Sequence, residues 1–516
     1  MRRPRWGWAL VAAVPALFIG YFFVYPVVRI LVLGLSELGV GAGAVESRLF
    51  RVGWFTLWQA TLSTLGTFLV AAPLTWAVSN FEFQGRRLAT ALVTVPFVLP
   101  TVVVGSAFVA LGWRGSVGAI IAAHIFFNVA VVVRTVSTLW GRIDPGLLEA
   151  ARVLGASERR VFWHVTLPLL RPALAAAASI VFLFTFTSFG VVLILGGFRY
   201  ATLEVEIYRQ AVTLFDLPLA AALAVVQLVG VSAALYAYSH YQETRAIAWT
   251  LAGEARRRRP RGAAAWAVVL SVLGTLALLA VPLVVLVARS LEANTYQRLF
   301  QEDRVVGTPI LAAGNSLVFA MVAMAVATII GMMAATVISA RAGRLSRWFD
   351  MVLMLPLGTS AVTIGFGFIV ALGWPVDLRG SMWLIPVAHA LVAVPFVVRS
   401  TVPTLRSIPT EIREAAGILG ASPLRVWRNI DLPIVSKAAL VGTAFSFVIS
   451  LGEFGATSFI ARPTTPTIPV MIFRLLSRPG ETSFGMAMAL SVVLAAITAG
   501  VVLLIDRARV GDVGRF

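Results

Sequence analysis

The sequence predicts an all-α, polytopic membrane protein with about 12 transmembrane helices, arranged as two six-helix halves that repeat in parallel. Apolar residues make up 59% of the 516 residues and charged residues only 13%, whereas about a quarter of the residues in a soluble domain are charged. The charges gather in short clusters between long apolar runs, and sequence patterns recur at a spacing of 265 residues. Composition and repeat together indicate a duplicated helical membrane domain.

Each apolar run is long enough to cross a bilayer as a helix, which needs about 20 residues. The first half is expected to span the membrane near residues 8–33, 54–79, 88–111, 119–140, 173–197 and 219–239. The second half is expected to span it near residues 263–288, 313–340, 350–373, 382–400, 438–460 and 484–505. The first run follows a basic start, as in a signal peptide, but it is too long for a signal-peptide core and is expected to remain as a span.

The basic residues predict the orientation of the spans. Loops on the side of the N-terminus hold 27 Arg and Lys residues, and the opposite loops hold 12. Because loops rich in Arg and Lys stay in the cytoplasm, both termini are expected to be cytoplasmic. The predicted organisation is a first half at 1–245, a basic cytoplasmic linker at 246–262 and a second half at 263–516.

Composition also excludes several function classes. The chain has no cysteine, which excludes disulfides, thiolate metal sites and cysteine nucleophiles. Its single lysine, Lys437, lies outside any GxxxxGK[ST] loop, so the chain is not expected to hydrolyse ATP. We predict no catalytic residue, no cofactor and no metal, because the sequence contains no HExxH motif and no cluster of metal ligands. The net charge of +19 is attributed to membrane topology and not to nucleic-acid binding, since no soluble basic domain is visible.

Equivalent positions of the two halves are expected to have the same orientation. His124 recurs as His389 and Arg134 as Arg399, both at an offset of 265 residues. Six spans separate these positions, and this even number predicts a pseudo-twofold axis along the membrane normal with a pathway between the halves. The histidines are expected to pack or form hydrogen bonds, and the arginines to reach from the ends of their spans to the interface.

A second repeated pattern lies in the longest cytoplasmic loops, 141–172 and 401–437. It reads EAARVLGASERRVFWHVTLP at 149–168 and EAAGILGASPLRVWRNIDLP at 414–433. Each copy is expected to form a small elbow: a helix, a glycine turn, and a second helix that the Leu-Pro sequence breaks before the next span. Asp144-Pro145 and Ser422-Pro423 are typical helix starts.

This pattern resembles the EAA loop of the permease subunits of bacterial ABC importers. The resemblance implies a type I importer permease in the bacterial inner membrane, with each elbow as a coupling helix on an ATP-binding subunit. It also implies two copies of that ATP-binding subunit, an extracytoplasmic solute-binding protein and the lipid bilayer as partners. The coupling residues that it implies are Glu149, Ala150, Ala151, Gly155, Leu167, Pro168, Glu414, Ala415, Ala416, Gly420, Leu432 and Pro433.

A fused pair of halves most resembles the permeases for thiamine and for ferric iron. The segments AHIFFN (123–128), SFGVVLILGG (188–197) and ATLEVEIYRQA (201–211) are more similar to thiamine permeases. Thiamine or its phosphates is therefore the expected solute, with ferric iron as the alternative. A proton-coupled secondary transporter also has twelve spans in two parallel halves, but the major facilitator superfamily does not place long loops after spans four and ten. A membrane-embedded enzyme would need a catalytic cluster, and none is apparent.

A polar face of the eleventh span is predicted to line the pathway. Glu453 is the only acidic residue well inside a predicted span, where an ionisable group is costly and by default functional. We expect a wall with one carboxylate that faces a cationic solute; the alternative is that Ser and Thr pack the helices and that Glu453 pairs with an arginine. The predicted pathway residues are Thr185, Ser188, Thr443, Ser446, Ser450, Glu453 and Thr457.

Overall fold

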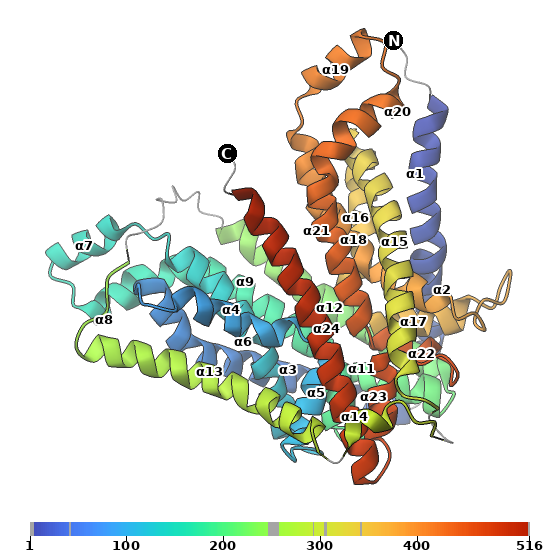
Figure 1. Cartoon of the computed structure of the whole chain (residues 1–516), viewed down its shortest axis with the longest axis horizontal. Helices are drawn as coiled ribbons and strands as arrows, with labels where there is room; N and C mark the ends of the chain where they lie inside the picture. Colours follow the sequence, from blue (N-terminus) through green and yellow to red (C-terminus); the bar gives the residue numbers. More distant parts are fainter. Residues whose placement is uncertain are drawn as a thin grey trace. The chain divides into compact units, whose positions relative to one another are not determined.

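The structure, a computed structural model, describes residues 5–40, 43–245, 257–292, 294–303, 307–340 and 343–513 (Figure 1). Within these ranges the chain is helical and forms no strand beyond two isolated bridges. The predicted all-α class is therefore confirmed. The predicted linker, 246–262, is described only from Arg257 onward.

The helices follow one another with few long connections. Those up to residue 245 are α1 (Arg5–Ile19), α2 (Tyr25–Val40), α3 (Gly43–Asn80), α4 (Arg86–Val98), α5 (Thr101–Ala110), α6 (Val117–Trp140), α7 (Pro145–Val153), α8 (Glu158–Val161), α9 (Leu167–Phe186), α10 (Gly190–Leu195), α11 (Leu203–Tyr208) and α12 (Leu217–Arg245). The others are α13 (Ala263–Ser290), α14 (Thr295–Arg298), α15 (Leu311–Ala340), α16 (Arg344–Gly358), α17 (Ala361–Ala371), α18 (Leu384–Ser407), α19 (Thr410–Ile418), α20 (Pro423–Val426), α21 (Leu432–Gly452), α22 (Gly455–Ile460), α23 (Ile468–Leu476) and α24 (Glu481–Val513). Short π-helical turns lie at η1 (Gly20–Val24), η2 (Phe162–Thr166), η3 (Arg209–Thr213) and η4 (Trp427–Asp431).

The described ranges hold ten helices that are long and apolar enough to cross a membrane. Two further pairs of helices are bent, and if each pair counts as one span the number rises to twelve. The pairs are α4 with α5, bent by 98°, and α16 with α17, bent by 101°. The spans predicted at 88–111 and 350–373 correspond to these two bent pairs, so neither is a single straight helix. In the first pair Leu99 is extended, as expected of a residue that precedes a proline. In the second pair Ser360 starts a new helix by accepting a hydrogen bond from the N–H of Val362.

The fifth and eleventh spans also differ from their predicted limits of 173–197 and 438–460. They begin earlier, since continuous helical segments run over Glu158–Phe186 and Pro423–Gly452. They also end earlier, and a short helix follows each break: α10 in the first half and α22 in the second. The two breaks lie at equivalent positions of the repeat.

The chain packs into two compact units. Unit 1 comprises Met1–Gly41, Ile207–Val225 and Ser290–Phe516, and unit 2 comprises Ala42–Glu206 and Val226–Arg289. The predicted halves follow the sequence repeat, whereas the compact units group the first spans differently: α1 and α2 belong to unit 1, and most of α13 belongs to unit 2.

Each unit has the same helical core. In unit 1 the helices α15, α18 and α21 pack on one another, and in unit 2 the equivalent helices α3, α6 and α9 do so. Glycines permit close approach in unit 1, because a Cβ atom at Gly331 or Gly442 would lie within 2.8 Å of atoms of Val397. Small residues at helix contacts are typical of membrane proteins, where van der Waals packing holds helices together.

Candidate functional site

Two small elbows project from the helix bundles, one from each unit. We call α7 with α8 elbow 1 and α19 with α20 elbow 2; Figure 1 shows each at one end of the bundle to which it belongs. Neither α7 nor α19 has a buried residue. In elbow 1 the carboxylate of Asp144 accepts a hydrogen bond of 2.9 Å from the N–H of Gly146. The first helix of each elbow is therefore exposed, and that of elbow 1 is stabilised by a side-chain cap, whereas α19, with Pro409 at its N-cap, has none.

The turn of each elbow has the same hydrogen bonds. Gly155 and Gly420 have φ angles of +83° and +82°, a conformation that glycine adopts without steric cost. The N–H of the following alanine bonds to the carbonyl of the second alanine of the EAA sequence, Ala151 or Ala416, at 3.1 and 2.9 Å. The sequence thus builds a glycine-terminated helix end twice, as predicted.

The tips of the elbows carry apolar side chains that the sequence argument missed. Val153 and Leu154 in elbow 1, and Ile418 and Leu419 in elbow 2, are each 87% exposed. These pairs precede the turn glycines at equivalent positions of the repeat. Exposed apolar side chains at matching positions mark a binding surface more clearly than scattered ones do. Their signal in the sequence was the apolar dipeptide before each glycine.

The prediction that Pro168 and Pro433 break the second elbow helix is wrong. In each copy a π-helical turn, η2 or η4, absorbs the proline and the helix continues into the span. The N–H of Leu167 bonds to the carbonyl of Phe162, and that of Leu432 to the carbonyl of Trp427, five residues back. A wider turn accommodates a residue that lacks an N–H and crowds the preceding turn. The second helix of each elbow, α8 or α20, is thus continuous with a membrane span.

Different side chains fasten the two elbows. In elbow 1 the guanidinium of Arg152 donates to both carboxylate oxygens of Glu158, at 2.6 and 3.2 Å, and this hydrogen bonding raises the pKa of Arg152. In elbow 2 Arg413 donates to Asp431 at 2.7 Å and to the carbonyl of Leu405 at 3.2 Å. The Arg152–Glu158 contact joins the two helices of elbow 1 to each other. The contacts of Arg413 instead join α19 to the ends of the spans α18 and α21.

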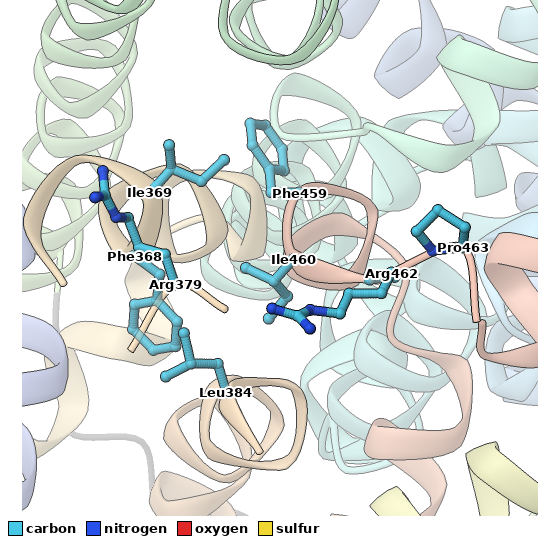
Figure 2. A pocket seen from close by; sticks show the side chains of 9 residues that line it. Phe368, Ile369, Arg379, Leu384, Phe459, Ile460, Arg462 and Pro463 are labelled. Carbon is cyan, nitrogen blue, oxygen red and sulfur yellow. The ribbon is translucent and has the colours of Figure 1, made fainter. Parts of the chain in front are cut away.

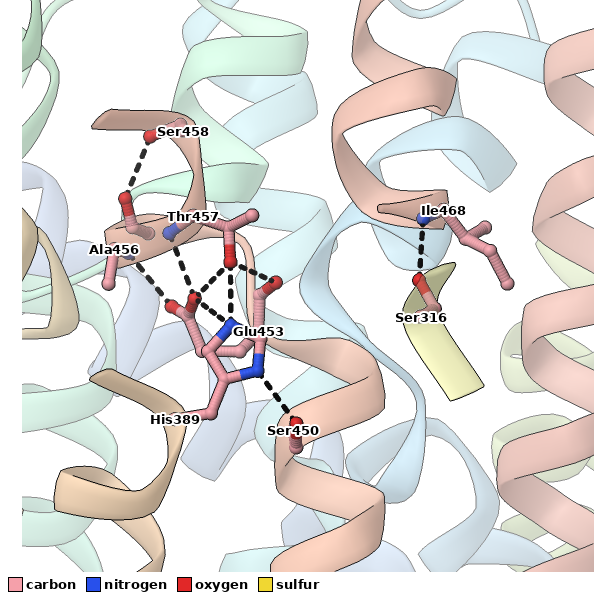
Figure 3. A network of polar contacts seen from close by, with 9 residues as sticks. Ser316, His389, Ser450, Glu453, Ala456, Thr457, Ser458 and Ile468 are labelled. Atoms are coloured by element: carbon pink, nitrogen blue, oxygen red, sulfur yellow. Dashed lines mark hydrogen bonds and ion pairs between the residues drawn. The ribbon is translucent and has the colours of Figure 1, made fainter. Parts of the chain in front are cut away.

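A second polar cluster lies at the break after α21 (Figure 3). The Glu453 side chain is buried and accepts hydrogen bonds from the backbone N–H groups of Ala456 and Thr457, at 3.0 and 3.1 Å, and from the Thr457 hydroxyl at 2.7 Å. His389 on α18 lies 3.2 Å from the same carboxylate and contacts the hydroxyl of Ser450 at 2.7 Å. The carboxylate therefore caps the start of α22 and pairs with a histidine, not with the arginine of the alternative interpretation.

The equivalent position of the first half carries a hydroxyl. Ser188 follows the end of α9 and lies 2.9 Å from Nε2 of His124, and Nδ1 of that histidine lies 3.1 Å from the hydroxyl of Ser63. The carbonyl of the nearby Thr185 accepts a hydrogen bond of 3.0 Å from Gln59. The expected hydrogen-bonding role of both histidines is confirmed. His124 connects α6 to the break after α9, and His389 connects α18 to the break after α21.

The predicted pathway residues do not share one continuous helix face, because α21 ends at Gly452. Thr443 contacts Thr328 at 2.9 Å, and Ser446 is buried and donates to the carbonyl of Gly442. Thr457 lies on α22, beyond the break. In the described ranges, no three His, Asp or Glu side chains lie close enough together to hold a metal ion.

Two further carboxylates are buried in unit 2. Glu204 on α11 accepts a hydrogen bond from the side-chain amide of Gln227, and Glu206 lies 3.4 Å from Arg48. Both side chains are almost inaccessible. These two carboxylates were not predicted from the sequence, because α11 is too short to register as a span. The alternation Leu-Glu-Val-Glu-Ile at 203–207 was the signal.

A small pocket of about 230 Å³ lies at the end of α22 in unit 1 (Figure 2). Apolar residues such as Phe368, Phe459 and Ile460 line it, and the guanidinium of Arg462 reaches between them. Arg379 stands at its edge and forms two hydrogen bonds of 2.9 Å with Asp377, which lower the pKa of that carboxyl group. The pocket is thus basic at its rim, and α21 separates it from elbow 2.

Comparison with known proteins identifies the family to which the chain with these features belongs. The family of binding-protein-dependent transport system inner membrane components matches the chain twice, at residues 69–245 and 327–510. The chain belongs to this family. Each match includes one elbow, one of the two repeat-related histidines (His124 or His389) and one break, so the duplicated features are duplicated family domains.

Two relatives of this family member extend over nearly its whole length. The thiamine transport system permease protein ThiP of Brucella suis is 28% identical over 507 residues, which cover 93% of this chain and 92% of that protein. A protein of Sinorhizobium fredii named as an ABC transporter permease, y4fN, is 24% identical over 546 residues, covering 95% and 94%. A Salmonella typhimurium protein named as a 2-aminoethylphosphonate transport system permease, PhnV, is 32% identical over 193 residues, covering 37% of this chain and 72% of its own.

The chain is therefore a multi-pass permease subunit of an ABC transport system. Such systems include ATP-binding and solute-binding components, and the predicted resemblance to fused importer permeases is confirmed.

Proposed function

We propose that this chain forms the translocation pathway of an ATP-driven importer for thiamine or its phosphates. The observation that carries the proposal is the similarity to a thiamine permease along 93% of the chain, through both copies of the elbow. A partial match to a 2-aminoethylphosphonate permease favours a small organophosphonate as the second candidate. ATP hydrolysis is assigned to a partner subunit.

The two elbows are the proposed docking sites for two ATP-binding subunits. Support comes from their identical turns, their exposed Glu149 and Glu414, and the apolar pairs at their tips. Small alanines on the same helices let a partner surface approach closely, and an apolar tip that inserts into a groove supplies binding energy. Because η2 and η4 keep the second helix of each elbow, α8 or α20, continuous with a span, a push on the tip can pass through the glycine turn and that helix to α9 or α21.

The proposed pathway follows the breaks at Ser188 and Glu453. In the described conformation Glu453 is satisfied by α22 and His389, so it is not presented to a solute. We infer that passage of a cation through this region requires the carboxylate to leave α22. One acid in one half then attracts the solute without trapping it.

Uptake into proteoliposomes tests the solute. The purified permease would be reconstituted with its ATP-binding and solute-binding partners and given radiolabelled thiamine. We expect ATP-dependent uptake that unlabelled thiamine and thiamine monophosphate suppress. Suppression by 2-aminoethylphosphonate alone would favour the second candidate, and suppression by ferric ion alone would favour the iron alternative of the sequence analysis.

Labelling of introduced cysteines tests the proposed orientation, in which both termini and both elbows are cytoplasmic. The chain has no native cysteine, so single cysteines at Ser157, Ser422 and Thr464 give clean reporters. An impermeant maleimide added to intact cells should label position 464, in the loop after α22, and spare the two elbow positions. Labelling of positions 157 and 422 in intact cells would contradict the proposed orientation and place the elbows outside the cytoplasm.

A further inference from the structure

A second cavity lies between α16 and α18 in unit 1, near the base of elbow 2. Its volume is about 200 Å³, and its lining residues are Asp350, Val398, Arg399, Val402, Pro403 and Arg406. Arg399, Val402, Pro403 and Arg406 recur at spacings of 3 and 4 and so share one face of α18. The cavity is therefore a groove with an apolar floor and a guanidinium at each end of that face.

The groove has an excess of positive charge. Arg399 is 63% exposed at its side chain, and its Nη1 lies 3.9 Å from the carboxylate of Asp350, a long and weak contact. Arg406 is exposed and makes no ion pair with the described part of the chain. One carboxylate thus opposes two guanidinium groups. Val398 is fully buried and Val402 nearly so, which makes the floor apolar.

The groove lies where a membrane span ends. α18 is an apolar span that ends at Ser407, and α19 of elbow 2 begins three residues later. On α16 the exposed Trp348 lies beside Arg347, a combination typical of the membrane interface. Beyond the groove, Met351 on α16 and Phe396 on α18 are exposed apolar residues. A ligand here would meet guanidinium groups inside the groove and exposed apolar surface beyond it.

The first half has related chemistry from different residues. Arg134 on α6 is equivalent to Arg399, and the position equivalent to Arg406 is Gly141. The guanidinium of Arg257, from the linker, lies against this glycine, since a Cβ atom at Gly141 would be 3.1 Å from its Nη2. Both halves therefore have two arginines toward the elbow end of equivalent spans: Arg134 and Arg257 at α6, and Arg399 and Arg406 at α18.

We propose that the groove between α16 and α18 binds the phosphate headgroup of an anionic phospholipid. Arg399 and Arg406 hold the phosphate, since guanidinium groups bind phosphate oxygens through paired hydrogen bonds, and the acyl chains lie along the exposed apolar faces of α16 and α18. Basic pockets between spans at the cytoplasmic side have the chemistry for such headgroups. Arg413 binds the carbonyl of Leu405, next to Arg406, so the bound lipid lies at the root of elbow 2.

Native mass spectrometry of the purified full chain tests this proposal, independently of transport. Protein titrated with phosphatidylglycerol or phosphatidylcholine should retain the anionic lipid preferentially. The double variant Arg399→Gln with Arg406→Gln should bind phosphatidylglycerol about thirtyfold more weakly, since each arginine near a membrane surface contributes about fivefold. The matched control, Arg425→Gln with Arg428→Gln, removes two exposed arginines of the same elbow region outside the groove and should bind as the unmodified chain does.

Two further measurements keep the result unambiguous. The double variant Arg399→Lys with Arg406→Lys retains the charge, so it should recover part of the binding if the Gln variant is folded and has lost only the headgroup contacts. Inorganic phosphate should not displace the lipid, because it lacks acyl chains. Equal lipid binding by the Gln variant and the control, or displacement by inorganic phosphate, would overturn the proposal.

Discussion

Elbow 1 and elbow 2 have the same backbone conformation at their turns, but different side chains hold them in place. Both have the EAA helix, the left-handed glycine and the apolar tip. The Arg152–Glu158 contact stays inside elbow 1, and its carboxylate side chain is 76% exposed. Arg413 instead joins elbow 2 to Asp431 and Leu405 at the bases of two spans. The comparison teaches that the positions shared by the two copies specify the turn and the exposed tip, whereas positions that differ between the copies decide how firmly each elbow is held.

The two breaks show the same division. A histidine from the preceding span bonds to the residue at the break in both halves, and that residue is Ser188 in one half and Glu453 in the other. Only Glu453 also caps the next helix through two backbone N–H groups. The shared histidine thus sets the geometry, and the residue it meets sets how strongly the break is held.

The largest expected effect comes from removing the stronger break contact. Glu453→Ala leaves the N–H groups of Ala456 and Thr457 and the His389 ring without their acceptor, which should cost about 3–5 kcal/mol of stability. Ser188→Ala removes one hydrogen bond from His124 and should cost about 1 kcal/mol. Thermal unfolding of both variants in the same detergent measures the difference.

Glu453→Gln sharpens this result, because it keeps an oxygen acceptor and removes the charge. It should be more stable than Glu453→Ala and should still reduce uptake if the charge attracts a cationic solute. Normal uptake by the Gln variant would contradict the pathway role, and a Glu453→Ala variant as stable as the unmodified chain would contradict the capping role.

The next largest effect concerns the elbow tips. Leu154→Asp and Leu419→Asp each place a charge where an apolar side chain is expected to enter a groove of the ATP-binding subunit. Burial of a leucine contributes about 1.5–3 kcal/mol, so each variant should weaken binding about tenfold to a hundredfold. Pull-down of the ATP-binding subunit measures it, with Leu291→Asp, an exposed leucine outside both elbows, as the control. Similar losses in the control would show that the tips are not the anchors.

Much of the architecture was predictable, because apolar runs follow directly from burial in lipid and the internal repeat relates the two halves. The helix ends at Gly155 and Gly420 were predictable too, since a left-handed turn requires a residue like glycine. The breaks after α9 and α21 were not, because apolar residues resume directly beyond Ser188 and Glu453, and the breaks depend on hydrogen bonds from His124 and His389 and on the capping contacts of Glu453. Leu167-Pro168 was misread as a helix end because a π-helical turn leaves no distinct pattern in sequence.

A moderate effect should separate the two fasteners. Arg413→Ala breaks a partly buried charged hydrogen bond and should destabilise elbow 2 by about 1.5–3 kcal/mol. Arg152→Ala breaks an exposed pair worth less than about 1 kcal/mol. Hydrogen exchange of the amides of α7 and α19 reports each loss locally. Faster exchange in α7 after Arg152→Ala than in α19 after Arg413→Ala would show that exposure does not decide how the elbows are held.

The smallest effect is expected at Glu149 and Glu414, which lie at equivalent positions of α7 and α19 and are exposed in both. If each pairs with a basic rim of an ATP-binding subunit, replacement by Ala should weaken docking by about 1 kcal/mol per elbow, or about fivefold. Uptake and substrate-stimulated ATP hydrolysis should then fall together in the double variant, while the protein stays folded. The single variants should differ, because Glu149 also interacts with Arg152, whereas Gly417 stands at the equivalent position in elbow 2. Glu149→Ala therefore loosens elbow 1 as well as its docking, and the greater deficit is expected there. If both activities survive in the double variant, coupling depends on the apolar tips and not on the two carboxylates.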